Sequence, residues 1–433
     1  MARTMLQGIG RLEFHRNRPV SEEAGLDATL AADLRRANRR DRLRALALAA
    51  PLLLLLLLSF GIPIVLLLGR AVYDPTIADA LPRTTQTLRH WTGEGAPDDA
   101  VFVSLAADLK DDQASNRLYE LAKSLNSRLP GARSHVLRAA RSLTAAAPAA
   151  TVNQVAADQI KADPFWGERD TWSAVKLGTR KVTSFYLLSA LDLRWNADGS
   201  LSFAPPEQAI FLRIFERTFL VAALVTLATL LLAFPFAYLI CSLPARYGAI
   251  LLIVVLLPFW TSILVRTAAW TVLLQKYGLL NEFAIWLGIA QDRLELMYSR
   301  TGLIIAMTHI QLPFTLLPIY SVMRTIQPAQ MRAAASLGAR PLTAFRRVYL
   351  PQALPGVMAG CLLTFILCLG YYITPALIGG AGDQLISNFI ANYVNVELNW
   401  EMAAALSFIL LALTIALYGV FARLLGLDRL KLV

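Results

Sequence analysis

Charged side chains are scarce in this sequence of 433 residues. Only 16% of the residues are Asp, Glu, Lys or Arg, while 56% are hydrophobic and the mean hydropathy is +0.51. Soluble proteins are closer to about 25% charged. Several apolar runs reach the roughly 20 residues that a helix needs to cross a bilayer. The alternating segments of about 10 residues that are typical of a membrane β-barrel are lacking. The sequence therefore predicts an all-α polytopic membrane protein.

Motifs for catalysis and metal binding are also lacking. Of the seven lysines, only Lys123 precedes Ser or Thr, and an alanine precedes that lysine, so no phosphate-binding GxxxxGK[ST] loop occurs. Neither GxSxG nor HExxH is present, and no His, Cys, Asp and Glu cluster has metal-ligand spacing. The three cysteines, Cys241, Cys361 and Cys368, lie in or beside apolar runs and are interpreted as packing residues. We expect neither an enzyme nor a metal site.

The net charge of +11 is interpreted as a signal of membrane topology and not of a nucleic-acid partner. In a soluble protein it would suggest nucleic acid, but basic residues beside membrane spans orient those spans. Residues 1–44 contain ten arginines and no lysine, whereas residues 379–400 contain neither Lys nor Arg. This bias predicts that both termini are cytoplasmic (N-in, C-in). We expect membrane lipid around the chain and no nucleic-acid partner.

Six transmembrane helices are predicted, at residues 45–69, 219–243, 248–274, 301–323, 354–378 and 402–425. A short amphipathic elbow at 209–218 is expected to lie in the membrane interface before the second span. The chain then divides into a cytoplasmic Arg-rich segment at 1–44, a first span at 45–69, a periplasmic insertion at 70–208, a transmembrane core at 209–427 and a cytoplasmic tail at 428–433.

The insertion at 70–208 differs in composition from the rest of the chain. Charges of both signs are mixed, and its apolar runs are short. Helical spacing is present at 101–109 and 118–129, and residues 193–203 are typical of a hairpin with its turn at 196–199. These signals predict a folded outer domain, either a cap or contact surface for an external partner or an elaboration without a role in transport.

Residues 330–351, QMRAAASLGARPLTAFRRVYLP, are too polar for a span and too regularly patterned for a linker. Ala333, Ala334 and Leu337 are expected to share one side of a helix. Gly338 either ends that helix or lets a partner approach the backbone. With both termini cytoplasmic, this stretch also faces the cytoplasm, which indicates a docking surface.

The spacing of this stretch resembles the EAA loop of binding-protein-dependent ABC importer permeases. The matching residues are Ala333, Ala334, Leu337, Gly338 and Ala339, followed by Phe345, Val348, Leu350 and Pro351. One position departs from the family pattern, because Arg332 stands where the family has a glutamate. The electrostatic role of that glutamate is therefore not carried over, whereas the Gly338 turn and the apolar contacts are.

The resemblance implies a type I (MetI-like) permease fold in a bacterial inner (cytoplasmic) membrane. It implies that the loop docks on a dimer of ATPase subunits, which bind ATP and Mg²⁺, so that this chain has no cofactor of its own. It also implies a second permease subunit, usually a paralogue, and a periplasmic solute-binding protein. Residues 257–270, 277–281, 310–323 and 369–380 resemble the spermidine/putrescine-type permeases within this family.

Candidates for the substrate pathway are polar or aromatic residues in and beside the apolar runs. They are Trp260, Thr261, Arg266, Gln311, Tyr371, Tyr372 and Thr374, with His309 and Pro375 as weaker candidates. Arg266 is either a gate or filter of the pathway, or a structural residue that snorkels or pairs with another span. Helix packing is the alternative for the others. Asp383 is expected to be an ordinary loop residue.

The expected function is passage of a small polar, amine-bearing solute such as a polyamine or an opine. Tyr371 and Tyr372 follow Gly370, where polyamine permeases often have an acidic residue, and this favours a polyamine less. Thiamine, phosphonates and amino-acid derivatives are alternative solutes. An ion-coupled secondary transporter would need intramembrane acids or a broken-helix repeat. A membrane enzyme would need the catalytic motifs that the sequence lacks.

Overall fold

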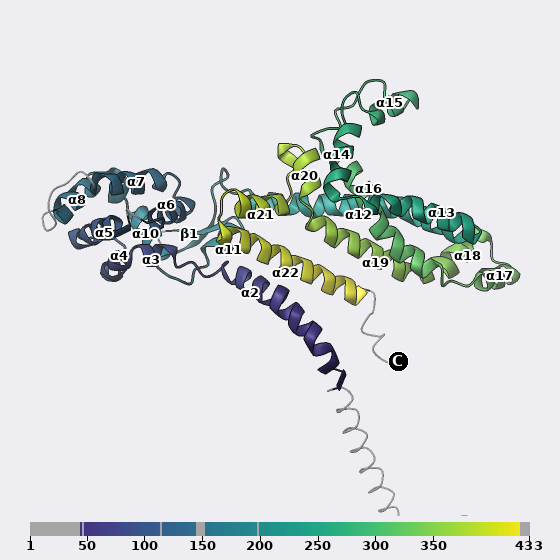
Figure 1. Ribbon diagram of the computed structural model, residues 1–433, viewed down its shortest axis with the longest axis horizontal. Coiled ribbons are helices and arrows are strands. Elements are labelled where there is room, and N and C mark those ends of the chain that lie inside the picture. Colours follow the sequence, from purple (N-terminus) through teal and green to yellow (C-terminus); the bar gives the residue numbers. More distant parts are fainter. Residues whose placement is uncertain (1–43, 46, 113–114, 144–151, 197–198, 425–433) are drawn as a thin grey trace, which may run out of the picture. The chain divides into compact units, whose positions relative to one another are not determined.

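The computed structural model describes residues 44, 45, 47–112, 115–143, 152–196 and 199–424 (Figure 1). The Arg-rich segment predicted at 1–44 lies outside the described residues except for Arg44, and so does the tail predicted at 428–433. The chain forms two compact units, residues 1–66 and 67–433. An apolar helix begins at Ala47 in the first unit and ends at Gly69, at the start of the second unit. Its most apolar stretch has no buried residues, as expected for a helix surrounded by lipid.

Five described helices are long and apolar enough to cross a bilayer. The first is Ala47–Gly69, which includes π-helix η1 (Leu57–Gly61) and α2 (Ile62–Gly69). The other four are α12 (Phe211–Ser242), α16 (Arg300–Met323), α19 (Leu350–Leu369) with the turns before it, and α22 (Trp400–Leu424). A bent helix pair brings the number to six if the pair forms one span. The all-α membrane fold is thus confirmed.

The third predicted span, 248–274, is wrong as one helix. It consists of α13 (Ala245–Leu256) with a 3₁₀ turn (Leu257–Trp260), followed by α14 (Ile263–Leu273), and the two parts are bent by 100°. Pro258 has no amide hydrogen to continue the helical pattern. The Ser262 hydroxyl then caps the new helix by accepting from the Val265 amide at 3.2 Å.

The separate interfacial elbow predicted at 209–218 is also wrong, because α12 runs without interruption from Phe211. Phe211, Ile214 and Phe215 are buried in a cluster that includes Ile386 and Met402. These apolar side chains therefore pack on protein, whereas Ile210 and Leu212 of the same segment remain exposed. The Phe211 and Leu212 amides are capped by the carboxylate of Asp192.

The fifth predicted span, 354–378, is interrupted in its second half. Helix α19 ends at Leu369, and α20 (Ile373–Ile378) follows after three residues. A 3₁₀ turn (Ala381–Asp383) and α21 (Ile386–Asn395) then lead to α22. The expected helix in 275–300 is present as α15 (Leu279–Trp286).

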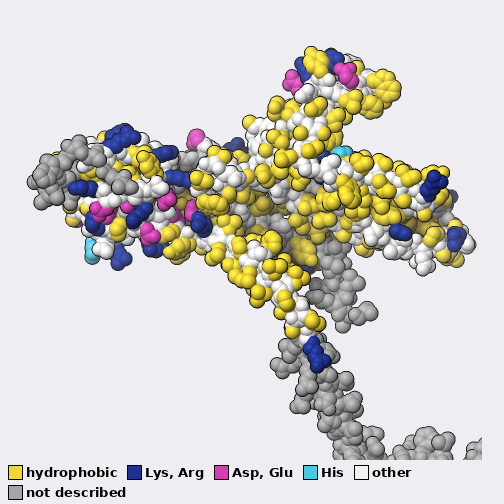
Figure 2. Space-filling view, in the orientation of Figure 1, with side chains coloured by type: hydrophobic (Ala, Val, Ile, Leu, Met, Phe, Trp, Pro, Cys, Tyr) yellow, Lys and Arg dark blue, Asp and Glu magenta, His cyan; other side chains and the backbone are white. Residues whose placement is uncertain are grey.

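Helices α12, α16 and α19 pack together as the centre of the core (Figure 1). Gly356 and Gly360 of α19 let that helix approach α16 closely, since a Cβ added at Gly360 would lie 2.6 Å from the Thr315 carbonyl oxygen. The buried hydroxyls of Thr315 and Thr364 are hydrogen-bonded at 2.5 Å. This combination of small residues and a buried polar pair is typical of helix contacts within membranes. Figure 2 shows hydrophobic side chains over the visible surface of these helices.

The insertion is a helical domain with a hydrophobic core of its own, as predicted. The predicted helices are present as α5 and α6, and the hairpin as β1 (Leu193–Trp195) paired antiparallel with β2 (Leu201–Phe203). Trp172 packs edge-on against Phe102 at 5.2 Å, and its indole donates to the Trp166 carbonyl at 2.5 Å. The helices are α3 (Thr76–Ala80), α4 (Pro82–Thr87), η2 (Leu88–His90), α5 (Asp99–Asp112), α6 (Arg117–Arg128), α7 (Ala132–Ser142), α8 (Val152–Lys161), α9 (Pro164–Gly167), α10 (Arg169–Gly178) and α11 (Phe185–Ser189).

A buried ion pair fixes the base of the insertion. The Arg128 guanidinium lies 3.2 Å from the Asp74 carboxylate, and the Tyr186 hydroxyl donates to the same carboxylate at 2.9 Å. Burial beside Asp74 raises the pKa of the Tyr186 phenol well above its usual value, so this hydroxyl stays a donor at any physiological pH.

The close contact at Gly360 leads to a prediction about stability. Gly360→Leu should destabilise the core by about 1–3 kcal/mol through overpacking against α16. The measurement is the thermal unfolding midpoint of the detergent-solubilised protein, which should fall. Gly419→Leu is the matched control, because nothing lies within 4 Å of a Cβ added at Gly419 in α22. Equal midpoints for both variants would contradict the close α16–α19 contact.

Candidate functional sites

The stretch at 330–351 begins inside α17 (Pro328–Ser336) and turns sharply at Gly338. The Gly338 amide donates to the Ala335 carbonyl at 2.9 Å, and the Ala339 amide donates to the Ala334 carbonyl at 3.0 Å. With a φ of +82° at Gly338, these bonds form a Schellman motif, which favours glycine. Of the two roles considered for Gly338, ending the helix is the one found.

The expected shared face of Ala333, Ala334 and Leu337 is only partly correct. Ala334 is buried, Ala333 is exposed, and the Leu337 side chain is 89% exposed. The helix ends at Ser336, so Leu337 is its C-cap and points away from the packed side. Arg332 is also exposed, and Ala339 is half-buried. The outward surface of the turn therefore carries Leu337 and Arg332, whereas Ala334 anchors it.

The second half of the stretch is anchored by aromatic rings. After α18 (Pro341–Ala344), the π-helix η5 (Phe345–Tyr349) leads directly into α19. Phe345 stacks on Tyr349 with ring centroids 5.5 Å apart and meets Tyr238 of α12 edge-on at 5.8 Å. Val348 is half-buried and Pro351 is exposed in the first turn of α19. Tyr349 was missed in the sequence, although its i+4 spacing from Phe345 is a signal for a shared face.

This arrangement makes a rigid loop with a charged outer surface. The rings hold its inner side on α12, while Leu342 and four arginines are exposed. These arginines are Arg332, Arg340, Arg346 and Arg347. In Figure 2, Lys and Arg side chains gather at the end of the core where Figure 1 labels α17 and α18. We name residues 330–351 the turn loop.

A second site lies where the two bent or broken helices meet α16. The Thr267 and Thr374 hydroxyls, both buried, are 3.2 Å apart and join α14 to α20. The Trp270 indole donates to Nδ1 of His309 at 3.2 Å, which joins α14 to α16. Sequence reasoning missed Thr267; its position directly after Arg266 was the available signal.

Several polar atoms at this site have no hydrogen-bond partner among the described residues. Gln311 is 1% exposed, and neither its amide oxygen nor its nitrogen has a partner. The same holds for Nε of Arg266 and the Tyr371 hydroxyl. Nearly all buried polar groups in proteins are paired, so unpaired ones indicate bound water, an ion or a ligand. We name Arg266, Thr267, His309, Gln311, Tyr371 and Thr374 the polar cluster.

The other candidates from the sequence lie at its edges. Trp260 is 88% exposed at the bend, and Thr261 accepts a hydrogen bond from Arg266 at 3.0 Å through its backbone carbonyl. Tyr372 is exposed at the break after α19. The interpretation of Asp383 as an ordinary loop residue is wrong, because its carboxylate accepts from Nε of Arg300 at 2.9 Å and is mostly buried.

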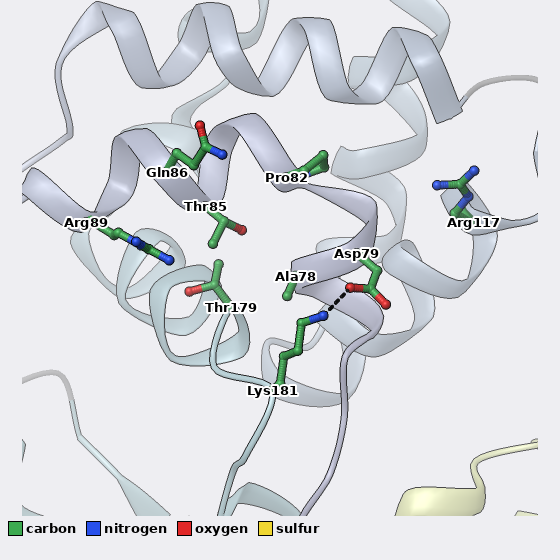
Figure 3. Close-up of a pocket in the computed structure, with 9 residues that line it drawn as sticks. All are labelled: Ala78, Asp79, Pro82, Thr85, Gln86, Arg89, Arg117, Thr179 and Lys181. Carbon is green, nitrogen blue, oxygen red and sulfur yellow. Dashed lines mark hydrogen bonds and ion pairs between the residues drawn. The ribbon is translucent and has the colours of Figure 1, made fainter.

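A surface pocket of about 740 Å³ lies in the insertion (Figure 3). The Lys181 ammonium and the Asp79 carboxylate form an ion pair at 2.8 Å within it, and this pairing raises the pKa of Lys181. Arg89 and Arg117 also line the pocket, so cations outnumber acids there. Such a lining is unsuited to a cationic solute. No group of three or more potential metal ligands occurs in the part of the chain that the structure describes.

Long apolar helices, a basic loop and a partly buried polar cluster at the helix breaks are the features of a multi-pass transport subunit. The chain belongs to the family of binding-protein-dependent transport system inner membrane components, whose sequence profile matches residues 209–426. It is therefore an inner-membrane permease subunit of an ABC importer, not an enzyme. Membership implies partners of two kinds, an ATPase and a solute-binding protein.

Two curated relatives agree with this assignment. The chain is 34% identical over 221 residues to the spermidine/putrescine transport system permease protein PotB of Escherichia coli (strain K12), covering 50% of this chain and 80% of that protein. It is 37% identical over 225 residues to the inner membrane ABC transporter permease protein YdcU of the same strain, covering 49% and 71%. A solved bacterial ABC transporter for import of the acidic polysaccharide alginate superposes with a TM-score of 0.40 at 18% identity, covering 50% of this chain and 80% of that one.

The aromatic anchor of the turn loop leads to a prediction. Phe345→Ala should free the loop from Tyr238 and Tyr349, since aromatic pairs contribute about 0.5–1.5 kcal/mol beyond the area they bury. A loss near 1.4 kcal/mol would raise the open population about tenfold, and tryptic cleavage at Arg332 and Arg347 would accelerate in proportion. Leu342→Ala is the control, because that side chain is 77% exposed. Unchanged cleavage of the Phe345→Ala protein would refute the anchoring role.

Proposed function

We propose that this permease forms the translocation pathway for a small amine-bearing solute of the polyamine type. The observation that carries the proposal is the 34% identity to a spermidine/putrescine permease across 80% of that protein. The polar cluster adds support, because its unpaired Gln311 and Tyr371 atoms can exchange hydrogen bonds with a passing amine. The rings of Tyr371 and Tyr372 also offer cation–π faces.

One feature of the polar cluster favours a second candidate. The Arg266 guanidinium keeps an unpaired Nε in a buried position, and a cation in such a place repels a polycation and attracts an anion. A solute with both an amine and an acidic group, such as an amino-acid derivative or an aminophosphonate, would suit it. A 2-aminoethylphosphonate permease of Salmonella typhimurium is 28% identical over 156 residues, 36% of this chain and 54% of that protein.

The turn loop is proposed as the contact with the ATPase subunits. It is rigid, exposed and placed at one end of α19, and Leu337 offers an apolar side chain to a groove. ATP and Mg²⁺ would be bound entirely by those subunits. Arg332, in place of the family's glutamate, would present a positive charge to them. A second permease, a paralogue, would complete the pathway, and a periplasmic binding protein would deliver the solute.

The Gly338 turn tests the coupling proposal. Gly338→Trp places a bulky side chain at a φ that costs an L-residue about 1–2 kcal/mol and covers the exposed surface of the turn. We expect normal membrane insertion, loss of the ATPase subunits from the purified complex, and uptake reduced at least about tenfold. Gly338→Asn is the control, since asparagine tolerates this conformation. Wild-type uptake by the Gly338→Trp protein would remove the turn loop from coupling.

Arg266 separates the two solute classes. In reconstituted vesicles with the full transporter, Arg266→Gln should leave putrescine uptake equal or higher, because a repulsive charge is removed. If the solute is an aminophosphonate, the same change should lower its uptake about tenfold or more, because a buried charge-assisted contact is lost. Arg213→Gln, at an exposed site near the start of α12, is the control. A fall in putrescine uptake would argue against the polyamine assignment.

A further inference from the structure

Helix α15 carries an apolar stripe that faces away from the rest of the chain. Leu279, Phe283, Trp286 and Leu287 recur at i, i+4, i+7 and i+8, which places them on one side of the helix. All four are exposed, Leu279 to 70% and Trp286 to 78%. Ile289, just beyond the helix, is exposed as well. Figure 2 shows hydrophobic side chains at the surface of the segment that Figure 1 labels α15.

The opposite side of α15 is fixed, so the stripe cannot turn inward. Asn281 is completely buried, and its amide donates to the carbonyls of Gln275, Lys276 and Leu294 at 2.9–3.2 Å. It also accepts from the Leu294 amide at 2.9 Å. Leu280 packs in the cluster that contains Trp270 of α14. The outward direction of the stripe is therefore built into the loop.

One pair of charges beside the stripe is neutralised locally. The Arg293 guanidinium pairs with the Glu282 carboxylate at 2.8 Å and lies over the Tyr277 ring at 4.8 Å. The Glu282 carboxylate raises the pKa of Arg293 further above its usual value, so the pair stays charged. Lys276, Asp292 and Glu295 also keep exposed charges in this loop, which can lie at the headgroup level.

The position of α15 in the chain limits what can cover it. Five residues separate it from the end of α14 at Leu273, and its other end connects to α16, which begins at Arg300. Both neighbours are apolar membrane segments, so α15 must remain close to the membrane surface. An eight-residue helix is about 12 Å long. Lipid at the membrane surface can therefore cover the stripe along its whole length.

We propose that α15 lies in the outer membrane interface, with its stripe inserted among the lipid acyl chains and glycerol groups. Aromatic and aliphatic side chains on one face, with charges at the border, are what such helices use. Trp286 and Tyr277 match the preference of these residues for the headgroup level. The lipid contact would fix the end of α14, and thus the position of Arg266 and Thr267. This inference needs only the membrane location of the chain and holds for any solute.

The test measures what surrounds the stripe. Cys241, Cys361 and Cys368 are replaced by alanine, a single cysteine is introduced as Phe283→Cys or Leu279→Cys, and a nitroxide label is attached. The complete transporter is reconstituted into phosphatidylethanolamine/phosphatidylglycerol vesicles. Collision rates of the label with oxygen, which concentrates in lipid, and with a water-soluble nickel chelate are then compared. The lipid contact predicts an oxygen-to-nickel accessibility ratio at least several-fold higher than that of the control label.

The control is Tyr119→Cys, an exposed position on α6 of the insertion, which should show high nickel and low oxygen accessibility. A label at Glu282, at the border of the stripe, should give an intermediate ratio. If both collision rates are low at 283 and 279, another protein covers the stripe and the proposal is wrong. If nickel accessibility matches that of position 119, the stripe is in water and the proposal is equally wrong.

Discussion

Lipid offers no hydrogen bonds, so every backbone group that a membrane segment frees must find its partner inside the protein. This constraint is strictest at the two helix breaks. At the bend before α14, the Ser262 hydroxyl caps the Val265 amide and Arg266 donates to the Thr261 carbonyl. At the break after α19, Ser387 and Asn388 of α21 donate to the carbonyls of residues 371 and 372, each at 2.8 Å. The first break is thus stabilised by neighbouring side chains, and the second by side chains of α21.

Helix α19 connects the turn loop to the break that precedes α20. Helix α19 starts directly after Tyr349, whose ring packs under the loop, and ends at Leu369 beside the polar cluster. Its 20 residues span about 30 Å. Gly356 and Gly360 hold it closely against α16 along the way. A displacement of the loop would therefore reach Tyr371 as the movement of one rigid body, without a chain of small adjustments.

Local signals in the sequence were sufficient for some elements and not for others. The Gly338 turn, the hairpin at β1 and β2, and the break near Tyr371 follow from glycine, turn residues and proline, whose preferences act within a few residues. The uninterrupted start of α12 was not predictable, because it depends on Phe211 packing against Ile386, 175 residues away. The ion pair between Asp383 and Arg300 likewise depends on a tertiary contact. The candidate pathway residues were selected as polar or aromatic residues in apolar runs, but their grouping required the fold.

Solvent exposure gives the arginines of this chain different roles. The four arginines of the turn loop are exposed, so water and salt screen their charges. A change in the sign of one such charge, as with Arg332 in place of glutamate, alters association rates more than affinity. Arg266 is partly buried, and its Nε lacks a hydrogen-bond partner. The lower dielectric constant there makes its electrostatic interactions several times stronger than those of an exposed arginine. The charge of Arg332 is therefore largely screened, whereas the charge of Arg266 acts strongly on the groups that surround it.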